Sequence, residues 1–253
     1  MDLKLKGKAI LITGASKGIG LALAKYLAAE GANISVCARN AEEVAAAVEA
    51  VKAFGVKAYG AAVDVKDAAS LTAWVDNSAK VLGGVDGFVS NVSAGGSAAD
   101  EAGWAANFET DVLSAWSTVQ AVQPHLEKST SPSIVNISST AALEAFAGAV
   151  PFSTFKAAML NYFGNLSNVL APQGIRVNSV CPGPVFIKDG AWDQIKTNMP
   201  EVYESTVAAI PMGRMATAEE VCVHVALLLS PISSFTTGTN IVVDGGFTKR
   251  IQY

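Results

Sequence analysis

Short apolar runs alternate along this chain with longer segments in which apolar residues recur at helical spacing. The short runs are rich in β-branched residues, which is typical of strands. The pattern predicts strands over residues 8–13, 34–38, 57–65, 86–92, 133–138, 175–180 and 240–243. It predicts helices over residues 18–30, 41–54, 68–82, 104–127, 153–170 and 218–229.

The order of these elements predicts an α/β fold. Strands and helices alternate, which favours a single Rossmann-type, doubly wound parallel sheet with helices on both faces. The strands are apolar almost throughout, as expected when both faces of a sheet are covered. With no internal repeat or linker, residues 1–253 are expected to form one domain. Residues 185–215 are less regular and follow the sixth strand, so they are a candidate substrate lid; the alternative is a surface excursion without a role.

Composition narrows the choice of partner and compartment. Of the 253 residues, 51% are hydrophobic and 16% are charged, so we expect a large core rather than disorder. The net charge of −4 gives no basic excess, so no nucleic acid partner is expected. The N-terminus lacks the apolar segment of a signal peptide, and the longest apolar run, 221–229, is too short to span a membrane. We therefore expect a cytoplasmic protein with no membrane partner.

Cysteine and histidine are few and scattered. Cys37, Cys181 and Cys222 form no Cys-x-x-Cys pair, which is typical of thiols used as small apolar residues in a reducing compartment. The two histidines, His125 and His224, cannot supply a histidine-rich cluster. No metal cofactor is therefore expected.

A glycine-rich turn joins the first predicted strand to the first predicted helix. Its sequence, TGASKGIG at residues 13–20, allows a tight turn and a close approach of the backbone to a ligand. The N–H groups and the positive dipole end of the following helix favour phosphate. In this position the turn predicts a site for the pyrophosphate of a dinucleotide. The alternative is a purely structural turn.

The end of the second predicted strand indicates which dinucleotide fits. Folds that bind NAD often have Asp or Glu there, as an acceptor for the ribose 2′-hydroxyl. This chain has Arg39 instead, and Ser16 and Lys17 add a hydroxyl and a cation nearby. An arginine pairs with a 2′-phosphate, which a carboxylate would repel. We therefore favour NADP(H) over NAD(H); the alternative is that Arg39 is a solvated charge.

Several segments, in order, resemble the short-chain dehydrogenase/reductase family over nearly the whole chain. Residues 13–20 match T-G-x-x-x-G-x-G, residues 182–185 match P-G-x-V, and residues 237–246 resemble T-G-x-x-x-x-V-D-G-G. Asp64 and Val65 match a pair that contacts adenine, and Asn91 lies in SNVS, where the family has N-N-A-G. The resemblance implies a homotetramer or homodimer. Together with the turn, it implies cofactor contacts at Gly14, Ser16, Lys17, Gly18, Ile19, Gly20, Arg39, Asp64, Val65, Asn91, Lys156, Pro182, Gly183 and Val185.

The same resemblance implies an oxidoreductase whose catalytic residues are only partly present. Ser139 and Lys156 stand where the family has its serine and lysine, but Phe152 replaces the tyrosine. Asp111 replaces the assisting asparagine, and Ile187 replaces a threonine that meets the nicotinamide. The candidate catalytic set is therefore Ser139, Phe152, Lys156 and Asp111, and the implied substrate is a small carbonyl or alcohol.

The loss of the tyrosine changes the proton chemistry. Carbonyl reduction needs a hydride, which NADPH supplies, and a proton at oxygen, which Phe152 cannot give. General acid–base catalysis contributes roughly 10²–10⁴-fold, or about 3–5 kcal/mol. Ser139 can still hydrogen-bond the substrate oxygen, Lys156 can still hold the nicotinamide ribose, and a water can relay protons. Asp111 either faces the site and pairs with Lys156, or only bends the helix through its backbone carbonyl.

No other tyrosine is a clear replacement. Tyr162 lies about 240° around the helix from Lys156 and so faces elsewhere, and Tyr203 lies in the candidate lid. Ser93 and Thr154 carry hydroxyls without obvious activation. The aromatic residues that could line an apolar pocket, or equally form core or subunit contacts, are Phe108, Phe146, Phe186, Trp192 and Tyr203.

Three functions remain open at this point. The first, which we favour because of the resemblance, is an NADP(H)-dependent carbonyl reductase or alcohol dehydrogenase with an incomplete or altered catalytic set. The second is a module that binds dinucleotide without turnover. The third is a non-redox reaction, such as dehydration or isomerisation, with Asp111 and Lys156 as acid and base.

Overall fold

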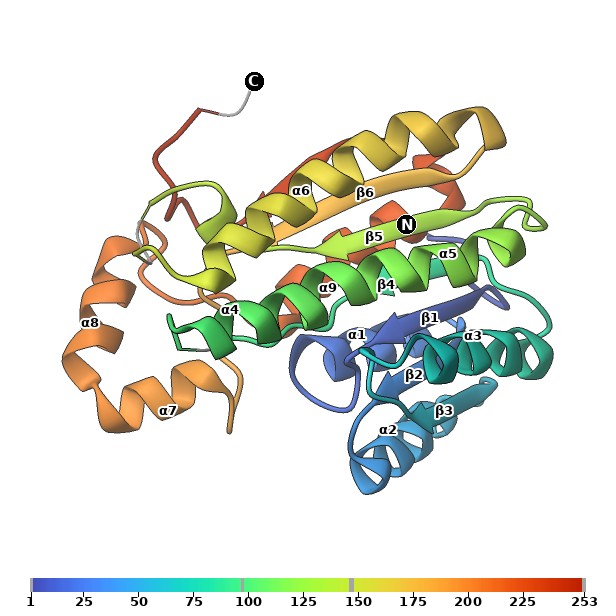
Figure 1. Cartoon of the computed structure of the whole chain (residues 1–253), viewed down its shortest axis with the longest axis horizontal. Helices are drawn as coiled ribbons and strands as arrows, with labels where there is room; N and C mark the ends of the chain where they lie inside the picture. Colours follow the sequence, from blue (N-terminus) through green and yellow to red (C-terminus); the bar gives the residue numbers. More distant parts are fainter. Residues whose placement is uncertain (1, 97, 146–147, 252–253) are drawn as a thin grey trace.

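Seven parallel strands form one sheet in the order β3-β2-β1-β4-β5-β6-β7 (Figure 1). The computed structural model describes residues 2–96, 98–145 and 148–251. The strands are β1 (Ala9–Thr13), β2 (Asn33–Ala38), β3 (Ala58–Ala62), β4 (Gly87–Ser90), β5 (Ser133–Ile137), β6 (Arg176–Pro182) and β7 (Asn240–Val243). The chain runs outward from β1 to β3, returns to β4 on the other side of β1, and continues to β7. This confirms the predicted doubly wound parallel sheet.

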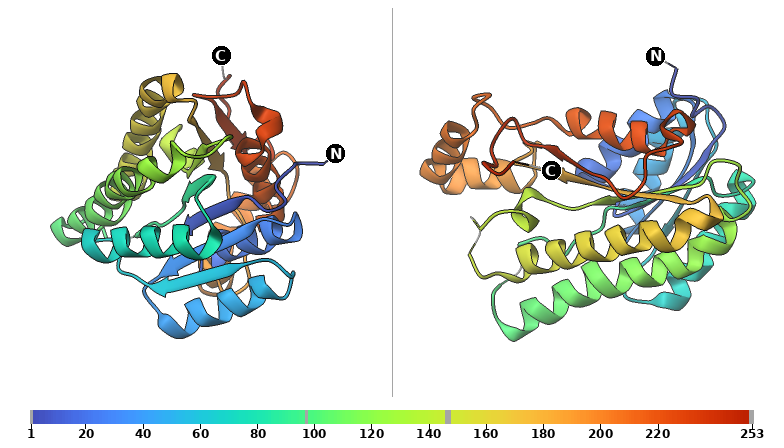
Figure 2. Two further views of the ribbon diagram at one scale, coloured as in Figure 1. Left: turned by 90° about the vertical axis from the view of Figure 1, so that its right-hand side faces the viewer. Right: turned by 90° about the horizontal axis from the view of Figure 1, so that it is seen from above.

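Helices cover both faces of the sheet (Figure 2). Buried residues of α1 (Gly18–Ala29), α2 (Ala41–Lys52) and α9 (Ala218–Leu229) form one core cluster with the strands. Buried residues of α3 (Ala68–Leu82), α5 (Ser114–Leu126) and α6 (Pro151–Leu170) form the second, on the opposite face. The remaining helices are α4 (Glu101–Asn107), α7 (Ala191–Asn198) and α8 (Pro200–Ala209). Within the described residues, no helix combines the length and apolarity needed to cross a membrane.

Side-chain caps explain where several helices begin. Asn40 accepts from two backbone N–H groups of α2, and Asp67 does the same for α3. Thr217 and Glu220 form a reciprocal capping box at the start of α9. Such caps satisfy N–H groups that the helix itself leaves unpaired. The start of α1 differs from these three, because no side chain caps it.

Two predicted segments differ in the structure. The helix predicted over residues 104–127 is divided into α4, a π-helical segment (Phe108–Leu113) and α5. The extra residue in a π-helical turn is invisible to a search for regular helical spacing. The segment 185–215, expected to be irregular, contains α7 and α8, which stand at one end of the molecule (Figure 1). Both helices are short, at 8 and 10 residues, and neither has a buried residue, so their helical periodicity is difficult to recognise in the sequence.

A buried arginine donates hydrogen bonds to the carbonyl groups at the C-terminus of α9. Arg176, at the start of β6, is 7% exposed. Its guanidinium donates to the carbonyl oxygens of Leu228 at 2.7 Å, Leu229 at 3.4 Å and Ser230 at 3.1 Å. These carbonyls lie at the negative end of the helix, where a cation is favoured. Arg176 therefore joins the sheet to the helix that covers it.

We expect Arg176→Met to lower the melting temperature by roughly 5–15 °C. The substitution leaves buried carbonyls without a donor, at a cost of about 2–4 kcal/mol. Arg39→Met is the matched control, because Arg39 is exposed and has no polar partner within the described residues. Thermal unfolding followed by circular dichroism measures both. Equal melting temperatures for the two variants would contradict the proposed role of Arg176.

Candidate dinucleotide and catalytic site

The glycine turn is held in shape by the neighbouring strand. Gly14 and Gly18 have φ of +64° and +63°, a conformation that favours glycine. The Asn91 side chain, just after β4, donates to the carbonyl oxygens of Thr13 at 2.9 Å and Gly14 at 3.0 Å. A Cβ at Gly20 would lie 2.5 Å from the Gly14 carbonyl oxygen, so no larger residue fits there. Asn91 therefore fixes the turn.

The turn leads into a helix end that is open to an anion. No side chain caps α1, and no acidic residue lies in its first turn. A Cβ built at Gly18 would meet nothing within 4 Å, so there is space in front of the backbone. Unpaired N–H groups, the positive end of the helix dipole and free space are what a pyrophosphate requires. The residues present therefore fit a dinucleotide.

The end of β2 lies against this turn. The Cys37 carbonyl oxygen accepts from the N–H groups of Gly14 at 2.9 Å and Ala15 at 3.3 Å. Arg39, two residues later, is exposed and has no polar partner within the described residues. Its guanidinium is therefore available to a ligand near the turn.

A carboxylate also lies near the turn. Glu43, in the first turn of α2, accepts from the Ser16 hydroxyl at 2.8 Å, and its other oxygen lies 3.8 Å from the Lys17 ammonium. Glu43 is not among the cofactor-binding residues predicted from the sequence. The available signal was its position, four residues after Arg39, in the first turn of the helix that follows β2.

Other predicted cofactor residues surround the same edge of the sheet. Asp64 is exposed and accepts from the Lys66 N–H at 3.0 Å, whereas Val65 is buried. At the end of β6, a Cβ at Gly183 would lie 2.7 Å from the Asp244 Cβ, which explains the glycine. In the same segment, Pro182 and Val185 are buried and Ile187 is half-buried.

Lys156 is a buried cation at the centre of the predicted catalytic set. It is 5% exposed, and its ammonium donates to the Ile137 carbonyl oxygen at 3.2 Å. The same nitrogen lies 3.6 Å from a carboxylate oxygen of Asp111. Burial lowers the pKa of Lys156, and the Asp111 carboxylate opposes that shift. The two residues form a buried ion pair.

Asp111 is held in place by the loop that follows β4. One carboxylate oxygen accepts from the Ser93 hydroxyl at 2.8 Å, and the other accepts from the Ala94 N–H at 2.7 Å. Asp111 is 2% exposed and lies in the π-helical segment. It thus both faces Lys156 and occupies a distorted helical turn. Of the two possibilities left open by the sequence, the structure shows the pairing with Lys156.

Phe152 and Ser139 complete the predicted set. The Phe152 ring centroid lies 5.9 Å from the Lys156 ammonium, so an aromatic ring occupies the expected position without a hydroxyl. Ser139 follows β5 and is half-buried, and its oxygen accepts from the Ala141 N–H at 3.1 Å. This bond leaves the hydroxyl hydrogen of Ser139 free to donate to a substrate oxygen.

Neither candidate tyrosine takes over the missing hydroxyl. Tyr162 packs edge-on against Phe163 in the second core cluster, and burial raises the pKa of Tyr162 to about 12. Its hydroxyl has no hydrogen-bond partner in the described part of the chain. Tyr203, on α8, packs edge-on against Phe186 with ring centroids 6.2 Å apart. Within the described residues, neither hydroxyl forms a hydrogen bond with Lys156.

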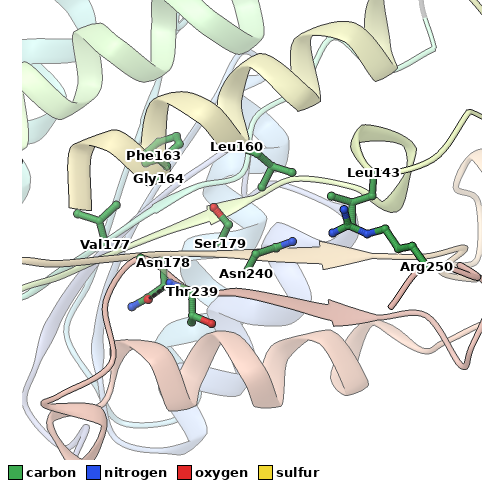
Figure 3. Close-up of a pocket in the computed structure, with 11 residues that line it drawn as sticks. Leu143, Leu160, Phe163, Gly164, Val177, Asn178, Ser179, Thr239, Asn240 and Arg250 are labelled. Carbon is green, nitrogen blue, oxygen red and sulfur yellow. Dashed lines mark hydrogen bonds between the residues drawn. The ribbon is translucent and has the colours of Figure 1, made fainter. Parts of the chain in front are cut away.

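Two cavities are lined in part by residues of α6. One, of about 210 Å³, lies between α6 and the last two strands (Figure 3). Its lining residues are Leu143, Leu160, Phe163, Gly164, Val177, Asn178, Ser179, Gly238, Thr239, Asn240 and Arg250. The other, of about 290 Å³, is lined by residues of 141–148 and by Ser153, Thr154 and Ala157. Of the described residues, none of the predicted catalytic set lines either cavity, and Phe146 lies outside the described residues.

The sequence of the chain matches one family profile and several characterised relatives over most of its length. The family profile described as enoyl-(acyl carrier protein) reductase matches residues 14–248. Isoepoxydon dehydrogenase patN of Aspergillus clavatus is 36% identical over 253 residues, with 98% of each chain covered.

Several solved structures are similar to this chain over nearly its whole length. NAD⁺-bound xylitol dehydrogenase has a TM-score of 0.90 at 29% identity, covering 96% of this chain and 100% of that one. L-Sorbose reductase from Gluconobacter frateurii, complexed with NADPH and L-sorbose, has a TM-score of 0.90 at 28% identity, covering 99% and 100%. An NADPH-bound short chain oxidoreductase from Pseudomonas aeruginosa PAO1, described as containing an atypical catalytic center, has a TM-score of 0.89 at 27% identity, covering 97% and 99%. The chain therefore belongs to the short-chain dehydrogenase/reductase family of oxidoreductases.

Proposed function

We propose that the chain transfers hydride between NADP(H) and a small carbonyl or alcohol, with a proton path that differs from the family's tyrosine. The observation that carries the proposal is the uncapped helix α1 behind an open glycine turn, at the edge of the sheet where β5 and β6 also end. Ser139 and Lys156 follow β5, so they belong to the same edge. In such sheets, ligands bind outside the carboxyl ends of the strands.

The cofactor contacts follow from this arrangement. The N–H groups of the turn and of α1 would hold the pyrophosphate, and Arg39, Ser16 and Lys17 would hold a 2′-phosphate. Asp64 and Val65 would contact adenine. When bound, NADPH supplies the hydride. Lys156, together with the segment that contains Pro182, Gly183 and Val185, would hold the nicotinamide end.

The chain's own residues would position the substrate oxygen and supply its proton. Ser139 donates a hydrogen bond to that oxygen. Lys156 is a buried cation with a lowered pKa, so it gives up a proton more readily than an exposed lysine does. Asp111 holds the ammonium in position and stabilises it. Phe152 makes the wall beside Lys156 apolar, so the proton comes from Lys156, directly or through a water.

The segment 185–215 would serve as a substrate lid. The Lys196 ammonium on α7 lies 5.5 Å from the Phe186 ring centroid and 5.4 Å from the Tyr203 ring centroid on α8. These cation–π contacts join both helices to the chain that leaves β6. The lid would therefore move as one piece.

A homo-oligomer is also proposed. Large apolar side chains are exposed on the helices of one face, with Trp116 on α5 at 51% and Val169 on α6 at 64%. Contacts with a second copy of the chain would cover them.

We expect NADPH to bind more tightly than NADH, and Arg39→Ser to weaken NADPH binding roughly 10- to 100-fold. Hydrogen bonds to a charged group contribute about 1.5–3 kcal/mol, and NADH offers Arg39 no phosphate. Calorimetric titration measures both dissociation constants. Arg214→Ser, which removes the same charge elsewhere, is the control and should change neither. Equal affinities of the unmodified chain for both cofactors would overturn the NADP(H) preference.

We expect Phe152→Tyr to raise kcat for carbonyl reduction roughly 10²–10⁴-fold, because it restores a general acid beside Lys156. NADPH oxidation with a panel of ketones measures the rate. Tyr162→Phe is the matched control, since it changes one oxygen on the same helix in the core and should leave kcat unaltered. NADPH binding without turnover by either the unmodified chain or Phe152→Tyr would instead support a binding module.

We expect Asp111→Asn to shift the alkaline limb of the kcat profile to lower pH. The carboxylate raises the pKa of Lys156, so its removal leaves burial to lower that pKa further. Reduction is then lost at a lower pH, as the ammonium that supplies the proton disappears. An unchanged pH profile would exclude Lys156 as the proton donor. Product formation without NADPH oxidation would favour non-redox chemistry.

A further inference from the structure

Glu43 lies among the groups that are expected to bind a 2′-phosphate. Its carboxylate accepts from the Ser16 hydroxyl at 2.8 Å and lies 3.8 Å from the Lys17 ammonium. Ser16 is only 9% exposed, so its hydroxyl is directed by the fold rather than by solvent. Two of the three donors assigned to the 2′-phosphate therefore already contact a negative group.

The position of Glu43 follows from local structure. The Asn40 side chain accepts from the N–H groups of Glu42 and Glu43, which fixes the first turn of α2. A carboxylate in that turn is stabilised by the helix dipole. The side chain of Glu43 is 40% exposed and contacts Ser16 and Lys17 of the glycine turn. Glu42 is also exposed, but within the described residues its side chain contacts neither Ser16 nor Lys17.

We propose that Glu43 is a cofactor-selectivity residue that opposes NADP(H) and favours NAD(H). The inference rests on the proposed dinucleotide site. A 2′-phosphate carries a charge of about −1.5 to −2 near neutral pH, so it is repelled by the carboxylate and must also take Ser16 and Lys17 from it. A free ribose 2′-hydroxyl can donate a hydrogen bond, and the same carboxylate can accept it.

Two opposed elements then set the choice of cofactor. Arg39 has no partner in the described chain and attracts the phosphate, whereas Glu43, which contacts Ser16 and Lys17, repels it. The ratio of the two dissociation constants reports their balance. Because the interaction is electrostatic and partly exposed, added salt should reduce the effect of Glu43.

The test compares Glu43→Gln with Glu42→Gln, which removes the same charge one residue away. Calorimetric titration with NADPH and with NADH measures binding without turnover. We expect Glu43→Gln to tighten NADPH binding about 10-fold relative to Glu42→Gln, and to leave NADH binding unchanged or weaker. In 0.5 M sodium chloride the NADPH effect should become smaller. Circular dichroism checks that both variants are folded.

The outcomes separate this inference from the proposed function. Equal NADPH-to-NADH ratios in Glu43→Gln and Glu42→Gln would overturn the role of Glu43 and leave the proposed function intact. Tighter NADH than NADPH binding by the unmodified chain, reversed by Glu43→Gln, would overturn the NADP(H) preference and support the role of Glu43. No binding of either cofactor to any of the three proteins would overturn both.

Discussion

A buried ammonium group must be compensated, and the predicted catalytic site is arranged around that requirement at Lys156. A charge removed from water is costly unless it is paired and hydrogen-bonded. The Ile137 carbonyl oxygen and the Asp111 carboxylate meet this need. Asp111 in turn needs its own donors, which Ser93 and Ala94 provide. The interruption between α4 and α5 lies where the helix presents Asp111 to these partners.

Two departures from the family's catalytic residues are physically connected through this lysine. A phenylalanine at position 152 offers the ammonium the face of a ring, at 5.9 Å, but no oxygen. An aspartate at position 111 offers a full negative charge at 3.6 Å. The Asp111 carboxylate therefore compensates the buried charge of Lys156, to which Phe152 offers no polar group. We interpret Phe152 and Asp111 as a matched pair rather than as two independent losses.

The sequence predicts the sheet and the glycine turn well, because both depend on local patterns. Alternating apolar runs and helical segments are sufficient to predict a doubly wound parallel sheet, and TGASKGIG lies between a strand and a helix. The contact between Asp111 and Lys156 was left open, because one inserted residue in a π-helical turn rotates all later side chains around the helix. The helices α7 and α8 were missed because they are short, at 8 and 10 residues, and have no buried residue. Glu43 was missed because its contacts cross between α2 and the turn.

The cofactor end of the site shows why a single position is a weak guide to dinucleotide choice. The residue after β2 is a cation, Arg39, and considered alone it favours a phosphate. The potential at the ribose, however, is the sum of every nearby charge, and α2 adds a carboxylate at Glu43. Arg39 and Lys17 bring two positive charges against one negative charge. Glu43 therefore makes this region less favourable to a 2′-phosphate than the end of β2 alone implies. The Ser16 hydroxyl, which donates to Glu43 in the structure, can donate to only one of the two anions at a time.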